Sequence, residues 1–535
     1  MSYFYPPDDN VLQNTTDNKL LLDGRLHLKA NIENLYFNVI KDHYSVSRRE
    51  ELKVSILPSI EFSFTVRDLK FIPIERSVQR SSHPYWEWVV QPGDIRPVAS
   101  GSGVVQVVFP FALQEINANC THNGVIEVRL TQSGEFIDGV YQVASETCAY
   151  FQFDLVGGVQ GEYFPKKIAN GRTESGIQKV SDDREITNYT ASNFSDDYPE
   201  IDIKKLIDLN SQAVTLSGIF IGKKNYILSC QTRAGDFPDC NDVSLPSYST
   251  AKTIYAGIGL MILEKQFPNI RLTKVTDVLP ECSVKNWQNV TLNDLINMRT
   301  GNYSSKQPNA DESSKEMVDF FLAETHAVKV KLACEMFTNK SAPGLNFVYH
   351  TSDTYLAGVM MQRLFNKFVE EGDFYQKVFV QGLWKKLSLS PLLNESKRTY
   401  DQVNQTFTGW GLTYKARDVV EISRFLFRQL NLEKEKQLLS FSLLQSSLQP
   451  GIAPASRKTE QDKLAYNNGV WAIEASDFLD CKKERWIPFM SGYGGISVVM
   501  ISPELIYYNF SDNGEYRWLT ALKELSQYFS VCEVL

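Results

Sequence analysis

The chain has 535 residues, and its 43% hydrophobic and 12% aromatic content excludes wholesale disorder. At about 100–200 residues per domain, this length predicts two to four domains. The formal net charge is −8 and no long basic run occurs, which argues against a nucleic-acid partner. The longest apolar stretch, near Ile254–Leu263, is too short to span a bilayer, so we expect no transmembrane segment.

The start of the chain lacks the basic residues and apolar run of a secretory signal peptide. Its eight cysteines and ten Asn-X-Ser/Thr sequons are nevertheless typical of an extracytoplasmic protein. We therefore expect a secreted or periplasmic protein whose export signal is not part of this chain. A cytoplasmic protein with eight free thiols is the alternative.

The N-terminal part is predicted to be β-structure. Period-two alternation of apolar and polar residues over Phe62–Arg67 and Ile126–Leu130 is typical of half-buried strands, and a turn-forming Asn-Gly pair precedes the second. No long helical period appears before about Ile201. We expect an N-terminal tail over residues 1–19, an all-β domain over 20–165 that is sandwich-like or a barrel, and a polar linker with several glycines over 166–200.

Aromatic residues gather in one predicted strand of this domain, at Tyr85, Trp86 and Trp88. Such residues usually fill the core of a β-sandwich, and this is what we expect here. A carbohydrate or peptide platform is the alternative.

The pattern changes after about Ile201. Two short β-segments around Lys223-Lys224-Asn225 predict a hairpin, and apolar residues at helical spacing follow from Ile254. Strands are predicted again at Ser497–Ile501 and Leu505–Phe510, before a final helical pattern through Trp518 and Phe529. We expect one α+β domain over residues 201–535, with a sheet completed by both ends of the domain and helices inserted between them.

The motif with the clearest chemistry is Ser249-Thr-Ala-Lys252, directly before the predicted helix. Residues three apart share a helix face, so the Lys252 ammonium can approach the Ser249 hydroxyl. A hydroxyl is a weak nucleophile and needs such an adjacent base or cation. The alternative is a helix N-cap followed by a solvated lysine.

This segment resembles the nucleophile helix of the serine β-lactamase and penicillin-binding-protein superfamily, and it looks closest to the branch of AmpC-type β-lactamases, D-Ala-D-Ala carboxypeptidases and related esterases. Further stretches resemble that branch in the right order: Val290–Gly301, Pro343–Gly358, Gly411–Val419 and Ser491–Gly495. The resemblance implies a β-lactamase-like domain over residues 201–535, with an antiparallel sheet flanked by helices and a helical subdomain.

The resemblance also implies roles for single residues. Ser249 would be the acylated nucleophile, Lys252 would take part in proton transfer, and Tyr349 would be the general base, its pKa lowered by the Lys252 charge. The oxyanion hole would combine the main-chain N–H groups of Ser249 and Tyr493. The other expected substrate-binding residues are Thr351, Met490, Ser491 and Gly492.

The chain departs from the family pattern at two of these positions. Met490 stands where the family has Lys or His, so the cation that would bind a substrate carboxylate is missing. Thr351 stands where the family usually has Asn. We therefore expect a serine hydrolase acting on an ester, amide or peptide bond of a small or peptide-like substrate.

Two alternatives remain open at this point. In the first, the protein is a catalytically impaired binding or regulatory protein on the same scaffold. In the second, the N-terminal β-domain is the working part and the hydrolase domain is its partner. The sequence does not name the substrate or the oligomeric state.

The resemblance implies no metal or organic cofactor. The six histidines form no H-x-x-x-H or H-E-x-x-H pattern, although His350 could line the pocket or point into a helix start. Cys120 and Cys148 flank β-segments and are candidates to pair, and Cys230 and Cys240 would close a short loop before Ser249. The pairing of the remaining cysteines is left open: Cys282, Cys334, Cys481 and Cys532.

Overall fold

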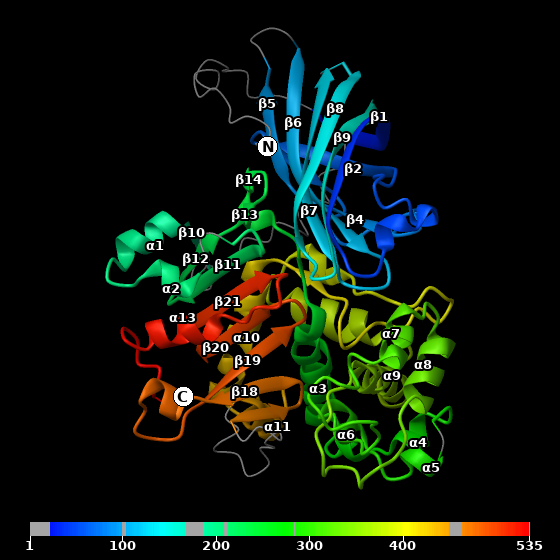
Figure 1. Ribbon diagram of the computed structural model, residues 1–535, viewed down its shortest axis with the longest axis vertical. Coiled ribbons are helices and arrows are strands. Elements are labelled where there is room, and N and C mark those ends of the chain that lie inside the picture. The colour runs from blue at the N-terminus through cyan, green and yellow to red at the C-terminus, as the bar shows by residue number, and fades with distance from the viewer. Residues whose placement is uncertain are drawn as a thin grey trace.

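The computed structural model describes residues 22–98, 103–131, 133–166, 186–207, 211–282, 284–448 and 463–533. The expected tail and most of the expected linker lie outside these residues. Figure 1 shows an upper part built of strands from the N-terminal third of the chain and a larger lower part that contains strands and helices.

The upper part is a single antiparallel sheet with strand order β4-β6-β5-β3-β2-β1-β9-β8-β7. The strands are β1 (Gly24–Asp42), β2 (Ile60–Arg67), β3 (Lys70–Pro73), β4 (Trp86–Val90), β5 (Gly93–Pro97), β6 (Val104–Glu115), β7 (Thr121–Thr131), β8 (Phe136–Thr147) and β9 (Phe151–Pro165). Two short 3-10 turns, Val46–Arg48 and Glu50–Leu52, follow β1.

This sheet closes on itself, because β6 pairs with β5 along one edge and with β7 along the other. We expected a sandwich-like domain or a barrel, and the single closed sheet corresponds to the barrel and not to two stacked sheets. The long strand β1 carries two register shifts against β9, between Asn31 and Tyr36 and between Val39 and Lys41. Such bulges bend a strand and increase its twist, which lets one continuous sheet curl round into a ring.

Aromatic side chains fill the interior of the ring. Trp86 and Trp88 are at most 1% exposed, and Phe71 stacks on Phe109 with ring centroids 4.7 Å apart. The expectation that the aromatic strand fills a core is therefore confirmed.

The lower part contains an eight-stranded sheet with order β10-β12-β11-β21-β20-β19-β18-β17. Its strands are β10 (Thr187–Thr190), β11 (Val214–Ile221), β12 (Lys224–Ser229), β17 (Leu464–Asn467), β18 (Val470–Glu474), β19 (Trp486–Gly492), β20 (Ile496–Ser502) and β21 (Leu505–Ser511). All pairs are antiparallel except β10 with β12. Because β11 pairs with β21, both ends of this part complete one sheet, as expected.

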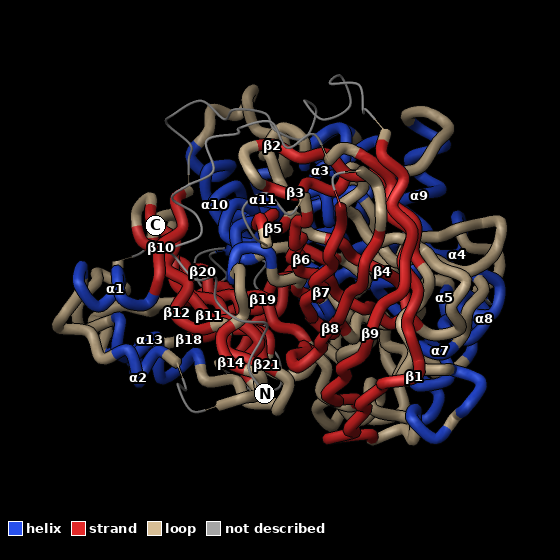
Figure 2. Tube along the Cα trace, turned by 90° about the horizontal axis from the view of Figure 1, so that it is seen from above, coloured by secondary structure: helices blue, strands red, loops and turns tan. Residues whose placement is uncertain are grey.

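Helices cover both faces of this sheet (Figure 2). On one face lie α1 (Ala191–Asp197), α2 (Ile203–Leu206) and α13 (Trp518–Leu525), and on the other lie α3 (Ile258–Gln266), α10 (Ala416–Asn431) and α11 (Phe441–Leu448). Helix α9 (Thr351–Phe368) packs against α3 on the side away from the sheet. Shorter or more peripheral helices are α4 (Val275–Val278), α5 (Val284–Trp287), α6 (Leu292–Ile296), α7 (Lys315–Leu322), α8 (His326–Glu335) and α12 (Ser476–Leu479). Strand β10 and helix α1 fall within the range that we expected to be linker.

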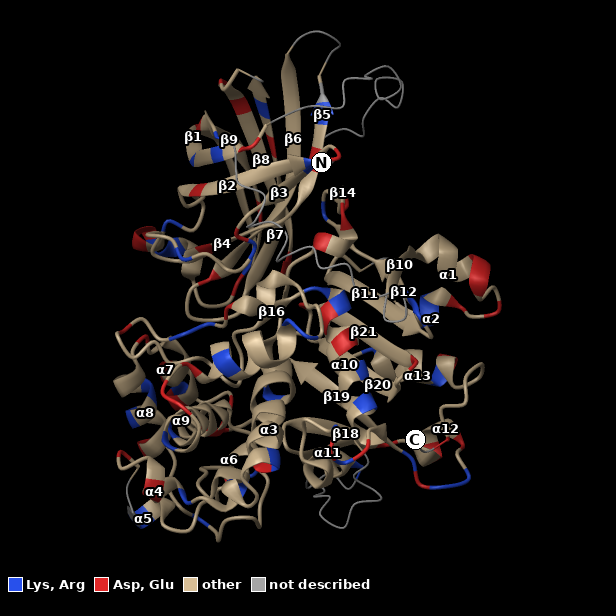
Figure 3. Ribbon diagram, turned by 180° about the vertical axis from the view of Figure 1, so that it is seen from behind, with Lys and Arg blue, Asp and Glu red and all other residues tan. Residues whose placement is uncertain are grey.

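All eight cysteines form disulfides. The two pairs considered from the sequence, Cys120–Cys148 and Cys230–Cys240, are both present. The other two are Cys282–Cys334 and Cys481–Cys532. Among the described residues, no helix combines the length and the apolar character needed to cross a membrane. Figure 3 shows acidic and basic residues interspersed over the face that it draws.

Candidate active site

Ser249 lies in a tight turn, Tyr248–Thr250, between a two-residue strand and the helix that continues as α3. The strand β15 (Leu245–Pro246) pairs with β16 (Thr413–Tyr414). The next residue, Ser247, continues this pairing, since its N–H donates to Leu412 O at 2.9 Å. The turn that carries Ser249 is thus anchored at its start to a segment 165 residues further along the chain.

Lys252 begins the π-helical segment Lys252–Gly257 and is only 1% exposed. Its Nζ donates to Ser249 Oγ at 2.9 Å, to Thr351 Oγ1 at 2.9 Å and to Gly409 O at 3.2 Å. These three bonds use all the hydrogens of an ammonium group. Burial lowers the pKa of Lys252 to about 8, although the charge of Glu312 opposes this shift. Near neutral pH, part of the population is therefore the neutral amine, which can accept a proton.

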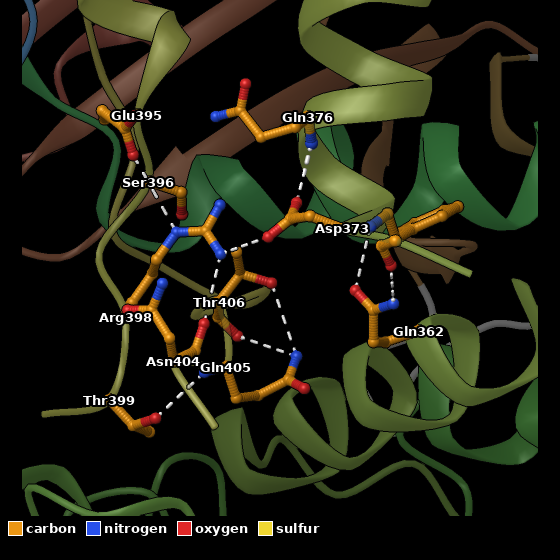
Figure 4. Close-up of polar contacts among 12 residues, drawn as sticks. Gln362, Asp373, Gln376, Glu395, Ser396, Arg398, Thr399, Asn404, Gln405 and Thr406 are labelled. Atoms are coloured by element: carbon orange, nitrogen blue, oxygen red, sulfur yellow. Dashed lines mark hydrogen bonds and ion pairs between the residues drawn. The ribbon is translucent and has the colours of Figure 1, made fainter. Parts of the chain in front are cut away.

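The segment that supplies the Gly409 carbonyl is held by buried polar contacts. Arg398 donates to Asp373 Oδ2 at 2.5 Å, as Figure 4 shows. Thr406 shares a hydrogen bond of 2.6 Å with the hydroxyl of Tyr255, on the helix that begins beside Ser249. The carbonyl of Gly409 therefore sits in a segment that is tied to the candidate nucleophile helix.

Tyr349 lies over Lys252, whose Nζ is 4.9 Å from the centre of the phenol ring. Burial raises the pKa of the Tyr349 phenol well above its ordinary value, and a side-chain hydrogen bond with Ser249 opposes this only in part. Our expectation of a lowered pKa is therefore wrong, because loss of solvation outweighs the neighbouring cation. In this state Tyr349 is a neutral phenol, which can donate a proton.

Glu312 is a residue that the sequence reasoning missed. It accepts the main-chain N–H of Thr351 at 2.8 Å through one carboxylate oxygen and the Thr351 hydroxyl through the other. Burial raises the pKa of the Glu312 carboxyl, while the Lys252 charge and the bonds from Thr351 oppose the shift. A hydrogen-bonded chain thus runs from Ser249 through Lys252 and Thr351 to Glu312. No motif spacing in the sequence marks this glutamate.

His350 does not line the site. It is 1% exposed, its Nε2 lies 3.0 Å from Asp311 Oδ2 and its Nδ1 lies 3.5 Å from Asp353 Oδ2. Burial lowers the pKa of His350, but the two carboxylates outweigh it and raise the pKa to about 9. The ring also stacks on Phe337 at 4.4 Å. His350 therefore fixes the start of α9. Of the two positions expected from the sequence, lining the pocket or pointing into a helix start, the structure has the second.

The segment Ser491–Gly495 approaches the turn that carries Ser249 through its main chain. Gly492 ends β19, and a Cβ atom there would lie 3.0 Å from Ser247 O. Ser491 is half-buried, and the ring of Tyr493, 51% exposed, lies 5.8 Å from the ring of Tyr248. These residues lie beside the turn that carries Ser249.

Met490 is placed differently from the expectation. Its side chain is 0% exposed and belongs to the apolar core between the sheet and α3, together with Ile254 and Val498. A side chain with no accessible surface offers nothing to a substrate in this state. Alternation along β19 explains the burial, since Met490 points to the core face while Phe489 packs on the opposite face.

The described residues bring one His/Cys/Asp/Glu group within metal-ligand distance, at Cys120, His122 and Cys148. Both sulfur atoms are already bonded to each other. A disulfide sulfur is not the thiolate that a metal requires, so this group does not fit a metal ion.

No family model and no curated protein matches this chain. Solved structures do match it. A class C β-lactamase is 12% identical and covers 63% of this chain and 97% of its own, with a TM-score of 0.44. A D-stereospecific amidohydrolase from Streptomyces sp. is 16% identical and covers 61% of this chain and 97% of its own, with a TM-score of 0.42. A penicillin-binding protein homologue from Caulobacter crescentus is 13% identical and covers 61% and 95%, with a TM-score of 0.44. These matching structures are members of the superfamily that the sequence motifs resemble.

Proposed function

We propose that this protein is a serine hydrolase that cleaves an ester, amide or peptide bond through an acyl-enzyme on Ser249, and that residues 201–535 form its hydrolase domain. The observation that carries the proposal is the distance of 2.9 Å between Lys252 Nζ and Ser249 Oγ. Lys252 is buried. A lysine with a pKa of about 8 at this distance can take the hydroxyl proton.

The proton transfers can be written so that they balance. Neutral Lys252 removes the proton of Ser249 as Oγ attacks the substrate carbonyl carbon, and the main-chain N–H groups of Ser249 and Tyr493 are the proposed donors to the oxyanion. The bond to the leaving group breaks, and its oxygen or nitrogen takes a proton from Tyr349. Tyr349 regains that proton from Lys252. Water then repeats the sequence to release the acid and restore Ser249.

The surroundings of Tyr349 favour a substrate with an uncharged, apolar group. The Tyr349 ring stacks on Trp471 at 5.9 Å and lies 6.3 Å from the ring of Tyr466 and 6.5 Å from that of Phe347. With Met490 buried, position 490 supplies no cation for a substrate carboxylate. We propose that Ser491, Gly492 and Tyr493 bind the substrate next to the scissile bond. The Thr351 side chain, also expected there, is buried and orients Lys252 instead, since its hydroxyl donates to Glu312 and accepts from Lys252.

The second candidate function is a binding or regulatory protein that has lost catalysis. The apolar, buried residue at position 490 favours it, whereas the contact of Lys252 with Ser249 opposes it. Incubation with a fluorophosphonate or a fluorescent penicillin, followed by mass analysis, separates the two. We expect the mass of one covalently bound probe on Ser249 of the wild type and no added mass in Ser249→Ala. No labelling by either probe, together with no turnover of short-chain aryl esters, would reject the enzyme.

We also propose that the protein works outside the cytoplasm, in the periplasm or after secretion. Four disulfides that use every cysteine support this location, since such bonds persist in oxidising compartments. Protein isolated from its native cells with thiols alkylated at lysis should carry no alkyl groups. Alkylation of several cysteines would indicate a reducing compartment.

A further inference from the structure

The connection between β6 and β7 extends from the closed sheet into the hydrolase part. Asn117 Nδ2 donates to Leu322 O and Ala323 O, both at 3.0 Å, at the C-terminal end of α7. Gln114 Nε2 donates to Thr413 Oγ1 at 2.7 Å, on β16 beside the nucleophile turn. This connection therefore lies against the candidate active site.

Asn119, at the centre of this connection, makes the most direct contacts. It is 0% exposed, and its Oδ1 accepts from Ser247 Oγ at 3.2 Å, from Tyr248 N at 3.2 Å and from Gly411 N at 2.5 Å. Its Nδ2 donates to Leu412 O at 3.4 Å. One amide from the N-terminal sheet thus holds two segments of the hydrolase part together.

Those two segments carry the reacting groups. Tyr248 immediately precedes Ser249 and has a positive φ of 40°, in the left-handed region. A residue other than glycine is strained in such a conformation, which persists only where its surroundings hold it. The second segment includes Gly409, whose carbonyl accepts from Lys252. Asn119 therefore fixes the nucleophile turn relative to the strand that orients the base.

The connection is itself rigidly supported. The Cys120–Cys148 disulfide joins the residue after Asn119 to the turn between β8 and β9. From that same turn, Tyr150 places its ring 6.5 Å from the ring of Tyr493, which also contacts Tyr248. The closed sheet thus approaches the nucleophile turn from two points.

We propose that the N-terminal sheet is an integral part of the catalytic unit, and that its Asn119 is a positioning residue for the Ser249 turn. The inference rests on the proposed acyl-enzyme function. It gives the N-terminal domain a role in the chemical step. The amide does not touch the substrate; it acts through the main chain of Tyr248 and Gly411.

The test compares full-length variants by the rate of fluorophosphonate labelling of Ser249, by kcat and KM for an aryl ester, and by melting temperature. Asn119→Ala removes the acceptor, and Asn119→Gln keeps an amide but moves its oxygen by one methylene. Asn117→Ala is the matched control, because it removes two bonds between the same two parts away from Ser249.

We expect Asn119→Ala and Asn119→Gln to lower kcat and the labelling rate at least about tenfold, with KM little changed, since about 1.4 kcal/mol of barrier corresponds to tenfold in rate. Asn117→Ala should stay within about threefold of the wild type, which corresponds to less than that 1.4 kcal/mol. If Asn119→Ala does not fold, Asn119→Gln against Asn117→Ala decides.

Two results would overturn the inference while leaving the proposed function in place: unchanged kcat in Asn119→Gln, or an equal loss in Asn117→Ala. Failure of the wild type to be labelled or to turn over esters would reject the proposed function, and this inference with it.

Discussion

The Glu312 carboxylate accepts two hydrogen bonds from Thr351, one from the main-chain N–H of Thr351 and one from the Thr351 hydroxyl. Since the hydroxyl hydrogen is committed to the carboxylate, Thr351 Oγ1 presents a lone pair to Lys252 Nζ at 2.9 Å. The Glu312 carboxylate therefore affects Lys252, the candidate base, in two ways. It orients the Thr351 hydroxyl that accepts from Lys252, and its charge raises the pKa of Lys252.

Removing that charge should move the pH dependence of acylation. The Glu312 charge raises the pKa of Lys252 against the larger effect of burial, which lowers it to about 8. In Glu312→Gln the Lys252 pKa should fall further, so the neutral amine forms at lower pH. We expect the rising limb of the labelling rate to shift to lower pH. Glu316→Gln, at an exposed position on α7, should leave the limb in place. A limb that stays or moves upward in Glu312→Gln would contradict the charge effect.

Lys252→Arg should abolish most of the reactivity while keeping a positive charge. A guanidinium stays protonated at all working pH values, so it cannot take the Ser249 proton. We expect labelling of Ser249 to fall by about 10²–10⁴-fold, the usual contribution of a positioned base. The same substitution at Lys315, which is exposed, serves as the control. Retention of more than a tenth of the rate would mean that Lys252 contributes mainly its charge.

Tyr349→Phe distinguishes a neutral phenol from a phenolate. Because burial holds the pKa of Tyr349 well above its ordinary value, we assign the rising limb near pH 8 to Lys252. The variant should therefore show a lower kcat, most of all with poor leaving groups that need protonation, but a limb at the same pH. Loss of the limb in a stopped-flow pH series would instead identify Tyr349 as the base.

Met490→Lys should destabilise the fold and should not create a carboxylate site. The Met490 side chain is fully buried in an apolar core, where an unpaired ammonium costs at least about 3 kcal/mol. Met490→Leu conserves volume and should cost less than about 1.5 kcal/mol. Urea unfolding of both variants measures the difference. A Met490→Lys protein of wild-type stability that binds carboxylate-bearing substrates would show that position 490 opens into the site.

The sequence predicts much of the hydrolase part because its motifs are local. The spacing of Ser249 and Lys252 needs only one turn of helix, and the largely apolar run of a strand such as β20 needs only its own residues. The roles of Glu312 and Asn119 depend on contacts with Thr351, 39 residues later, and with Gly411, 292 residues later. The periodicity of apolar residues along the sequence carries no information about contacts between residues so far apart. The choice between a sandwich and a barrel for the first sheet stays open at the level of sequence for the same reason, since the β6–β5 and β6–β7 registers are set by packing and bulges.

The direction of the Tyr349 pKa shift shows the same limit. The sequence places a cation near Tyr349, and that alone favours a lowered pKa. Whether burial outweighs the cation depends on how completely residues such as Tyr466 and Trp471 enclose the phenol, which only the folded structure reveals.

The burial of Asn119 has a consequence for how the protein can be produced. Asn119-Cys120-Thr121 is itself an Asn-X-Thr acceptor sequence. In a eukaryotic secretory host, an oligosaccharide added while the chain is still emerging would sit on the amide that must later lie between Ser247 and Gly411. Such material would be unable to dock its two parts and would be secreted poorly or inactive. Expression in a bacterial periplasm avoids the modification and still allows the disulfides to form.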